Sequence, residues 1–273
     1  MVTLSRIRVH SRSVLTLLVT LMIVSATAFG QQPFYTDDAD VTPKGRFHFE
    51  FSNEFDRLQR SSFPNLRQNT ADFELDYGLF DGFEVSIESP LLMIFNARGT
   101  SPRAASGIGD TNFGFKYNFR RERDGSRLPA MTITLNVELP TGDTRRQLGS
   151  GLSDVALNGI LQKSLTRQTK LRLNGGVLFS GNETTGVIGI KTRGVVFTGG
   201  ASLVRDMTRK LKLGAEITGA VTRNFDLGKG RLQGQIGGNY ALREGLTLDF
   251  GIGGGRFPAS PRFGLQIGIS ADF

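Results

Sequence analysis

The chain alternates between apolar and polar residues over most of its length, with a repeat of two. Phe47, Phe49, Phe51 and Phe55, for example, alternate with polar or charged neighbours. Such a repeat predicts β-strands whose two faces meet different surroundings. We find twelve such segments, near residues 46–55, 70–77, 83–88, 112–119, 131–139, 154–162, 170–179, 195–203, 211–218, 231–242, 246–252 and 262–273.

The lengths of these segments and of their connections predict a membrane barrel. Many segments approach the roughly ten residues that a tilted strand needs to cross a bilayer, whereas soluble strands average about five or six. Connections near 79–82, 164–168, 206–209 and 243–245 are short, and those near 57–69, 94–107, 140–151 and 180–193 are long. Short periplasmic turns, long outer loops and an even strand number are typical of outer-membrane barrels. The prediction is an all-β, antiparallel transmembrane β-barrel of outer-membrane type, with about twelve strands. It must close, because lipid offers no partner to a free sheet edge.

The first thirty residues have the layout of a secretory signal peptide. Arg6, Arg8 and Arg12 precede an apolar run over 14–24, and small residues near 26–30 offer cleavage sites. The apolar run is too short to be a membrane-spanning helix. We therefore expect a signal peptide over 1–30, a periplasmic N-terminal segment over 31–44 and the transmembrane barrel over 45–273. The predicted location is the bacterial outer membrane.

The N-terminal segment carries an acidic run, from Thr36 through Asp37 and Asp38 to Asp40. One interpretation is a solvated periplasmic leader. Another is a latch that folds up into the barrel, where its carboxylates meet inward-facing Arg or Lys. A third is a calcium site, which the run fits poorly because it lacks the spaced ligands of an EF-hand loop. We expect no bound metal.

The glycine count bears on the shape of the predicted barrel, and the cysteine count bears on the kinds of site that the chain can form. The 273 residues include 35 glycines, and most of these follow residue 170, inside the later predicted strands. There they leave room in a lumen or let strands bend. The absence of cysteine excludes disulfides, cysteine-based zinc sites and iron–sulfur clusters. We expect no cofactor.

The polar parity of the strands defines a set of candidate lumen-lining residues. Acidic members come mainly from the first four strands, and most basic members come from later strands. Charged walls set the selectivity of pores. The alternative is that these groups form ion pairs that fill a narrow lumen and stabilise the barrel. The candidates are His48, Glu50, Asp72, Glu74, Asp76, Glu84, Glu88, Asp110, Lys116, Lys170, Arg172, Lys212 and Arg231.

The predicted outer connections carry twelve Arg or Lys against three acidic residues. Lipopolysaccharide phosphate is the expected anionic partner, with anionic solutes or an ordinary solvated surface as alternatives. No basic groove or module for nucleic acid is apparent. The chain ends in an alternating strand with Phe273 as the last residue, which resembles the signal read by the barrel assembly machinery.

Catalytic residues are not predicted. A hydrolytic nucleophile usually needs a histidine base, and His48 is the one histidine after the predicted signal peptide. Its parity places it inside the first strand, and the chain lacks a Gly-x-Ser-x-Gly elbow. The glycines of Gly251–Gly255 lie in an alternating strand and do not open a helix, so they do not form a dinucleotide loop.

Several short stretches resemble the phenol-degradation meta-pathway (MetA-type) outer-membrane transporter family. They are Pro33–Asp40 with Pro43–Gly45, Gly107–Asp110 with Gly114–Tyr117, Glu138–Asp143 and Gly149–Val155. The resemblance covers about 31–273. It implies a barrel related to hydrophobic-compound channels, but it supplies no substrate-binding residues.

The expected function is passive uptake of small solutes, including hydrophobic or aromatic compounds, through a polar lumen. The long loops or the N-terminal segment would gate the passage. Expected partners are outer-membrane lipid and lipopolysaccharide, the barrel assembly machinery and a small-molecule solute. A closed structural or interaction barrel without transport is the alternative, and an outer-membrane hydrolase is disfavoured by the missing triad.

Overall fold

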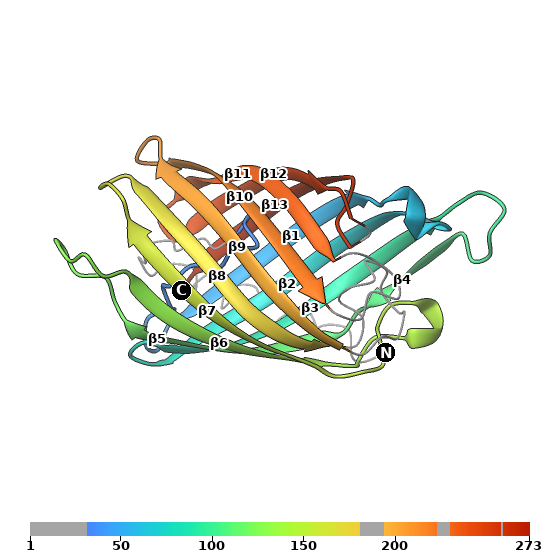
Figure 1. The fold of residues 1–273 in the computed structure, drawn as a ribbon, viewed down its shortest axis with the longest axis horizontal. Coiled ribbons are helices and arrows are strands. Elements are labelled where there is room, and N and C mark those ends of the chain that lie inside the picture. The colour runs from blue at the N-terminus through green and yellow to red at the C-terminus, as the bar shows by residue number, and fades with distance from the viewer. Residues whose placement is uncertain (1–31, 181–193, 223–229, 258) are drawn as a thin grey trace, which may run out of the picture.

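A computed structural model describes residues 32–180, 194–222, 230–257 and 259–273, so the predicted signal peptide over 1–30 lies outside the described residues. The described chain forms one antiparallel sheet that curls into a barrel (Figure 1). Its strands are β1 (Phe47–Arg57), β2 (Asn65–Phe80), β3 (Phe83–Asn96), β4 (Ala104–Ile108), β5 (Thr111–Arg120), β6 (Ala130–Leu139), β7 (Asp154–Ser164), β8 (Thr169–Ser180), β9 (Gly194–Asp206), β10 (Leu211–Thr222), β11 (Arg231–Arg243), β12 (Leu246–Gly255) and β13 (Phe263–Asp272).

The barrel closes between its first and last strands. β1 pairs with β2 on one side and with β13 on the other, and β2 also pairs with β3. The terminal residue completes the closure, because Phe273 and Phe47 exchange two backbone hydrogen bonds of 2.8 and 3.0 Å. β4 and β5 both pair with β3, one after the other, so they are two halves of one strand position. The barrel therefore has twelve strand positions, which confirms the predicted architecture.

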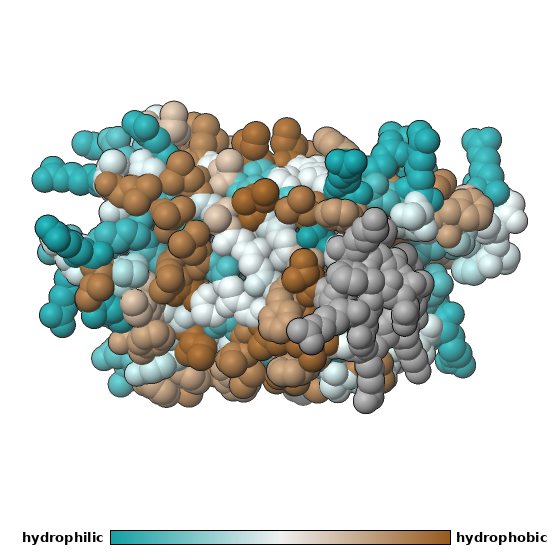
Figure 2. All heavy atoms as spheres, in the orientation of Figure 1, coloured by the Kyte–Doolittle hydropathy of each residue, from teal (hydrophilic) through white to brown (hydrophobic). Residues whose placement is uncertain are grey.

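The two faces of the sheet have opposite character. Along β13 the residues from Phe263 to Ser270 alternate between exposed and buried, and the exposed positions include Leu265, Ile267 and Ile269. Figure 2 shows hydrophobic residues around the middle of the barrel and hydrophilic residues gathered at both ends. The outward face thus matches lipid, and the inward face carries the polar residues. Within the described ranges, no helix is both long and apolar enough to cross a membrane.

The two ends of the barrel differ in their connections. The turns between β2 and β3, β7 and β8, β9 and β10, and β11 and β12 are tight and lie at one end, on the left in Figure 1. Since short turns of outer-membrane barrels face the periplasm, we call this the periplasmic end and the opposite end the outer end.

Two predicted outer loops are shorter than the sequence indicated. β2 begins at Asn65 and β3 continues to Asn96, so strand covers much of 57–69 and 94–107. A short 3-10 helix, Arg60–Ser62, lies in the remaining β1–β2 connection. These strand extensions contain stretches without clear alternation, and there the repeat of two gives no signal. The predicted loop over 180–193 falls almost wholly outside the described residues.

The connection after β6 folds back onto the break between β4 and β5. The carboxylate of Asp110, in that break, accepts hydrogen bonds from the backbone N–H groups of Gly142 and Ser150, each at 2.8 Å. Leu148, beyond the 3-10 helix Thr144–Arg146, is buried in a cluster with Leu92, Ile94 and Ala105. Three of the stretches behind the family resemblance, around 107–110, 138–143 and 149–155, therefore meet at one place.

Candidate functional site

The segment before β1 lies inside the lumen and turns within it. At its start, Asn239 Nδ2 donates to the backbone carbonyl of Gln32, and Gln266 Nε2 is 2.5 Å from Gln32 Oε1. At its bend, Glu216 accepts hydrogen bonds of 2.9 Å from the backbone N–H groups of Tyr35 and Thr36. The chain then returns to the periplasmic end, where β1 begins. We call residues 32–42 the lumen segment.

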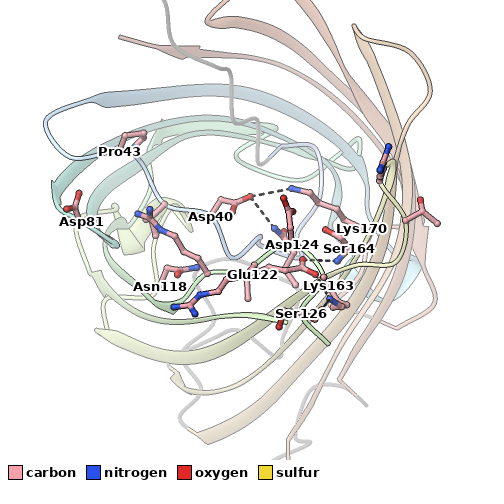
Figure 3. Close-up of a pocket in the computed structure, with 18 of the residues that line it drawn as sticks. Asp40, Pro43, Asp81, Asn118, Glu122, Asp124, Ser126, Lys163, Ser164 and Lys170 are labelled. Atoms are coloured by element: carbon pink, nitrogen blue, oxygen red, sulfur yellow. Dashed lines mark hydrogen bonds and ion pairs between the residues drawn. The ribbon is translucent and has the colours of Figure 1, made fainter. Parts of the chain in front are cut away.

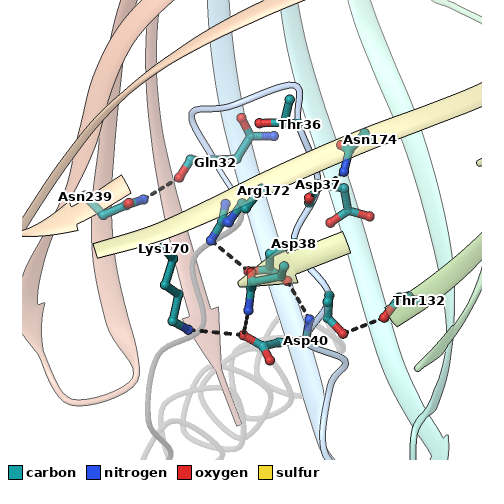
Figure 4. A network of polar contacts seen from close by, with 12 residues as sticks. Gln32, Thr36, Asp37, Asp38, Asp40, Thr132, Lys170, Arg172, Asn174 and Asn239 are labelled. Carbon is teal, nitrogen blue, oxygen red and sulfur yellow. Dashed lines mark hydrogen bonds and ion pairs between the residues drawn. The ribbon is translucent and has the colours of Figure 1, made fainter. Parts of the chain in front are cut away.

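The acidic run of the lumen segment forms ion pairs with three basic residues on two strands of the wall. Asp37 Oδ1 is 2.9 Å from Lys116 Nζ on β5. Asp38 Oδ2 is 3.0 Å from Arg172 Nη2 on β8 (Figure 4). Asp40 Oδ2 is 3.6 Å from Lys170 Nζ. This is the arrangement that the latch interpretation expected. The carboxylates face cations, and no group of three or more His, Asp or Glu in the described chain is arranged to hold a metal ion.

The surroundings shift the pKa values of Asp37 and Asp38, two acids of the lumen segment, in opposite directions. Burial raises the pKa of Asp37 to about 6, although the nearby Lys116 opposes this shift. Burial acts in the same direction on Asp38, but Arg172, Lys116 and Lys170 together outweigh it and lower the pKa of that carboxyl. Asp38 is thus held as a charged anchor, whereas Asp37 titrates closer to neutrality.

The carbonyl of Ala39 is a further attachment point. It accepts hydrogen bonds from Asn118 Nδ2 at 2.5 Å and Thr132 Oγ1 at 2.7 Å, while the Ala39 side chain packs with Ala130 and Ile160. Ala39 is fully buried. Backbone and side chain are therefore both fixed at this point of the segment.

Glycines on the opposite wall make room for the other half of the lumen segment. A Cβ at Gly200 on β9 would lie 2.7 Å from Thr36 Cγ2, and one at Gly214 on β10 would lie 2.8 Å from Phe34 Cζ. At Gly237 on β11 a Cβ would lie 2.7 Å from Pro33 Cγ and also 2.5 Å from the backbone oxygen of Phe250 on the neighbouring strand. Neighbouring inward positions thus lack side chains where the segment passes, because a side chain there would push it away. We call this surface the glycine trough.

Two cavities remain beside the lumen segment, and their linings differ in charge. The first, of about 370 Å³, faces the wall of β1–β3. The second, of about 360 Å³, faces β6–β10. Acidic side chains line the first cavity, namely Asp37, Glu50, Glu54, Asp72, Glu74, Glu84 and Glu88, together with Lys116. Amides and hydroxyls are the most numerous groups in the second, which we call the neutral cavity after them, namely Asn112, Thr134, Asn136, Asn158, Asn174, Thr198 and Thr218. Asp37, Glu138, Asp154 and Arg231 also line it, so it holds fewer carboxylates than the first, which we call the acidic cavity.

A wider vestibule of about 1230 Å³ opens at the periplasmic end (Figure 3). Lys163 pairs there with Glu122, and Lys170 pairs with Asp40 at the base of the lumen segment. Lys44, Arg121, Arg123 and Arg167 add further positive charge to its lining.

The structure places the predicted lumen residues at different depths and in different roles. Glu50, Asp72, Glu74, Glu84, Glu88 and Lys116 line the acidic cavity, Arg231 lines the neutral cavity and Lys170 lines the vestibule. Arg172 is buried at Asp38, and Asp76 is buried on β2. His48 lies between Glu50 Oε1 at 2.8 Å and Asp272 Oδ1 at 2.5 Å. Lys212 is exposed near the periplasmic rim, and Asp110 caps the loop after β6.

Sequence reasoning did not single out several residues of the site. Tyr35 reaches across the lumen, where its hydroxyl donates to Glu54. Most asparagines and threonines of the neutral cavity were also absent from the candidate set, whereas Glu54 was expected to point inward with the other acids of the first strands. Their positions on the inward face of the strands were visible in the sequence. The alternation along one strand does not show which residues of different strands line the same cavity.

The fold is similar to solved structures of outer-membrane proteins at low sequence identity. An outer-membrane channel from Pseudomonas putida F1 matches with a TM-score of 0.64 and 16% identity, over 86% of this chain and 98% of that chain. The NanC porin matches with a TM-score of 0.56 and 10% identity, over 82% and 98% of the two chains. The KdgM porin gives 0.52 and 9%, over 83% and 99%. A comparison with curated proteins finds no match.

The closed barrel, its apolar exterior and these likenesses agree on an outer-membrane barrel, which confirms the predicted location in the bacterial outer membrane. A family profile covers the described barrel and the lumen segment together. Its description is "Putative MetA-pathway of phenol degradation", and it matches residues 31–273. The chain belongs to this family.

Proposed function

We propose that the protein is an outer-membrane channel for the passive passage of small solutes through its lumen. The observation that carries this proposal is the space left beside the lumen segment. Two cavities of about 360 and 370 Å³ flank the segment, and the vestibule of about 1230 Å³ lies at the periplasmic end. A lumen intended only to stabilise the barrel would be filled by side chains, as in small closed barrels.

The lining favours solutes that are small and able to form hydrogen bonds. The neutral cavity presents amides and hydroxyls, each of which both donates and accepts. The family description refers to phenol degradation. We extend this to the proposal that small aromatic compounds with a hydroxyl group are among the solutes, since the hydroxyl replaces contacts to water inside the lumen.

The lumen segment is the proposed constriction. Its attachments are numerous but individually modest, and several are ion pairs that water can replace once the segment moves. We propose that it restricts passage to small solutes and that its partial release widens the path.

Reconstitution tests the proposal directly. The refolded full-length mature protein, in planar bilayers, is expected to give small conductance steps, and in liposomes it is expected to admit monosaccharide-sized solutes but to exclude larger oligosaccharides. A deletion strain is expected to take up a dilute hydroxylated aromatic compound more slowly, with recovery on complementation. Silent bilayers together with unchanged uptake would instead support a closed structural barrel.

We propose no catalytic role for His48. Both of its ring nitrogens face carboxylates inside the lumen, at Glu50 and Asp272. A hydrolase acting on membrane lipid would need its base at the lipid face. The replacement His48→Asn is expected to leave the refolded protein without any change in esterase background, measured with a chromogenic ester.

A further inference from the structure

Two turns at the periplasmic rim lie side by side. The β7–β8 turn and the β9–β10 turn are joined by a hydrogen bond of 2.8 Å from the backbone N–H of Asp206 to the carbonyl of Gln168. The adjoining strands pair directly, with Arg205 opposite Thr169. Residues 165–168 and 205–210 therefore form one continuous patch, which we call the basic rim.

The basic rim is strongly positive and exposed. Arg167, Arg205, Arg209 and Lys210 are all exposed on it, with Arg167 at the edge that also lines the vestibule, and Asp206 is the one acidic residue in these two stretches. None of the four cations takes part in an ion pair recorded within the described ranges. Four cations this close repel one another, so the patch favours an anionic partner.

Apolar side chains stand among these charges. Leu165 and Met207, near the tips of the two turns, are 54% and 53% exposed. Arg205 shares the outward face of β9 with Leu203 and Phe197, both of which point to lipid. Its guanidinium is therefore carried on the membrane-facing side, at the level where the apolar belt ends. A soluble polyanion would contact the charges but would leave these apolar side chains in water.

Aromatic residues mark the same level elsewhere on the barrel but not here. On the side of β1–β3 and β13, Phe47 lies 4.7 Å from Tyr77 and 5.7 Å from Phe273, between ring centroids. No Phe, Tyr or Trp occurs in 159–178 or 198–224, which include the periplasmic parts of β7–β10. Outer-membrane barrels ordinarily carry aromatic girdles at both interfaces. Cations take the place of aromatic residues at the basic rim.

We propose that the basic rim binds the phosphate of an anionic phospholipid in the inner leaflet of the outer membrane. The planar guanidinium forks of Arg167, Arg205 and Arg209 suit phosphate oxygens, and Leu165 and Met207 enter the apolar boundary beside them. The site anchors this side of the barrel by headgroup contacts, whereas the opposite side is anchored by rings.

Native mass spectrometry tests the site. The full-length mature protein is released from nanodiscs of equal phosphatidylglycerol and phosphatidylcholine, and the ratio of the two retained lipids is measured. The wild type is expected to retain phosphatidylglycerol in excess. The variant Arg167→Gln/Arg205→Gln/Arg209→Gln is expected to lose that excess by at least about tenfold, since each cation near an anionic surface strengthens binding severalfold.

A matched control removes the same charge from the outer end. Arg60, Arg98 and Arg103 are exposed there, and the variant Arg60→Gln/Arg98→Gln/Arg103→Gln is expected to retain the excess of phosphatidylglycerol. Both variants must migrate as folded, heat-modifiable barrels in cold gel electrophoresis. An equal loss in the two variants, or no loss in either, would overturn the proposal.

A second variant distinguishes lipid from a soluble polyanion. Leu165→Ser/Met207→Ser is expected to reduce retention of phosphatidylglycerol while leaving every charge in place. Binding to isolated peptidoglycan sacculi is measured in parallel. If the triple arginine variant lost sacculus binding but kept its phospholipid ratio, the partner would be the cell-wall polymer and the lipid proposal would be wrong.

Discussion

The lumen segment meets the two walls of the barrel in different ways. On the side of β9–β11 it lies against the glycine trough, where its own atoms occupy the places of missing side chains. On the side of β1–β3 it leaves a cavity lined by carboxylates. One wall therefore positions the segment by shape, and the other leaves a path beside it.

This difference separates what holds the segment from what a solute meets. The trough and the ion pairs of Asp38 and Asp40 hold the segment, while the acidic wall and the neutral amides face open space. Changes on the two walls should therefore have different effects. Substitutions in the glycine trough should change the conductance, because they change how the segment is held. Substitutions on the acidic wall should change the ion selectivity of the path.

Deleting residues 33–40 is expected to have the largest effect. Without them the two cavities merge and the buried wall cations gain access to water, so single-channel conductance in planar bilayers should rise severalfold. Heat-modifiable migration checks that the barrel still folds. If the conductance of a folded deletion variant equals that of the wild type, the segment is not the constriction.

Filling the glycine trough is expected to have the next largest effect. A side chain in Gly200→Val collides with Thr36, whose Cγ2 lies 2.7 Å from the position of the new Cβ. Displacement of the segment should raise conductance, though less than deletion does, since the ion pairs of the acidic run remain. Gly175→Val is the control, because a Cβ there meets no atom within 4 Å. Equal conductance in the two variants would argue against the trough.

The pH dependence of the segment follows from Asp37. This carboxyl faces Lys116 on β5, Glu84 on β3 and its neighbour Asp38, and its pKa is raised by burial from 3.8 to about 6. The docked segment therefore binds a proton more tightly than a released segment does. Docking is favoured below about pH 4, and this contribution is lost as the pH rises to about 6.

Open probability is expected to rise a few-fold between pH 4 and 6.5, when measured at constant ionic strength. Asp37→Asn should remove most of this rise, because it can no longer titrate. The lowered pKa of Asp38 acts in the opposite direction but only below its ordinary value, where protonation would weaken the anchor to Arg172. A rise that persists undiminished in Asp37→Asn would assign the pH dependence to other groups.

The repeat of two in the sequence predicted the strands, the closure and the two faces of the wall. These three features depend on residues that are neighbours in the chain and on the apolar exterior that a barrel needs in lipid. A local pattern of apolar and polar residues reflects both. The same pattern missed the outer parts of β2 and β3, where alternation becomes unclear. It also did not reveal the break at Asp110, whose hydrogen bonds reach to Gly142 and Ser150.

The site was harder to predict than the barrel. The acidic run indicated a latch as one of three interpretations, but Glu216, which holds Tyr35 and Thr36, lies about 180 residues away. The crowded glycines of the second half indicated space without showing what occupies it. Contacts across a lumen have no fixed spacing in the chain, so only the closed barrel brings Gly200 to Thr36 and Tyr35 to Glu54.

The smallest expected effect concerns ion selectivity, and it tests the acidic wall by itself. Asp72 and Glu74 line the acidic cavity on β2, and neither takes part in a recorded hydrogen bond or ion pair with the lumen segment. Asp72→Asn/Glu74→Gln should therefore leave the segment docked while it removes negative charge from the path. The cation-to-anion permeability ratio, from reversal potentials in a salt gradient, should fall about two- to threefold, because charged walls attract counter-ions within about one Debye length. The control Asp206→Asn/Glu244→Gln removes two charges from exposed turns that line neither the cavities nor the vestibule, and its ratio should stay near that of the wild type. A wild-type ratio in the wall variant would mean that ions bypass the acidic cavity and cross by the neutral one, so that the difference between the two walls would concern only how the segment is held.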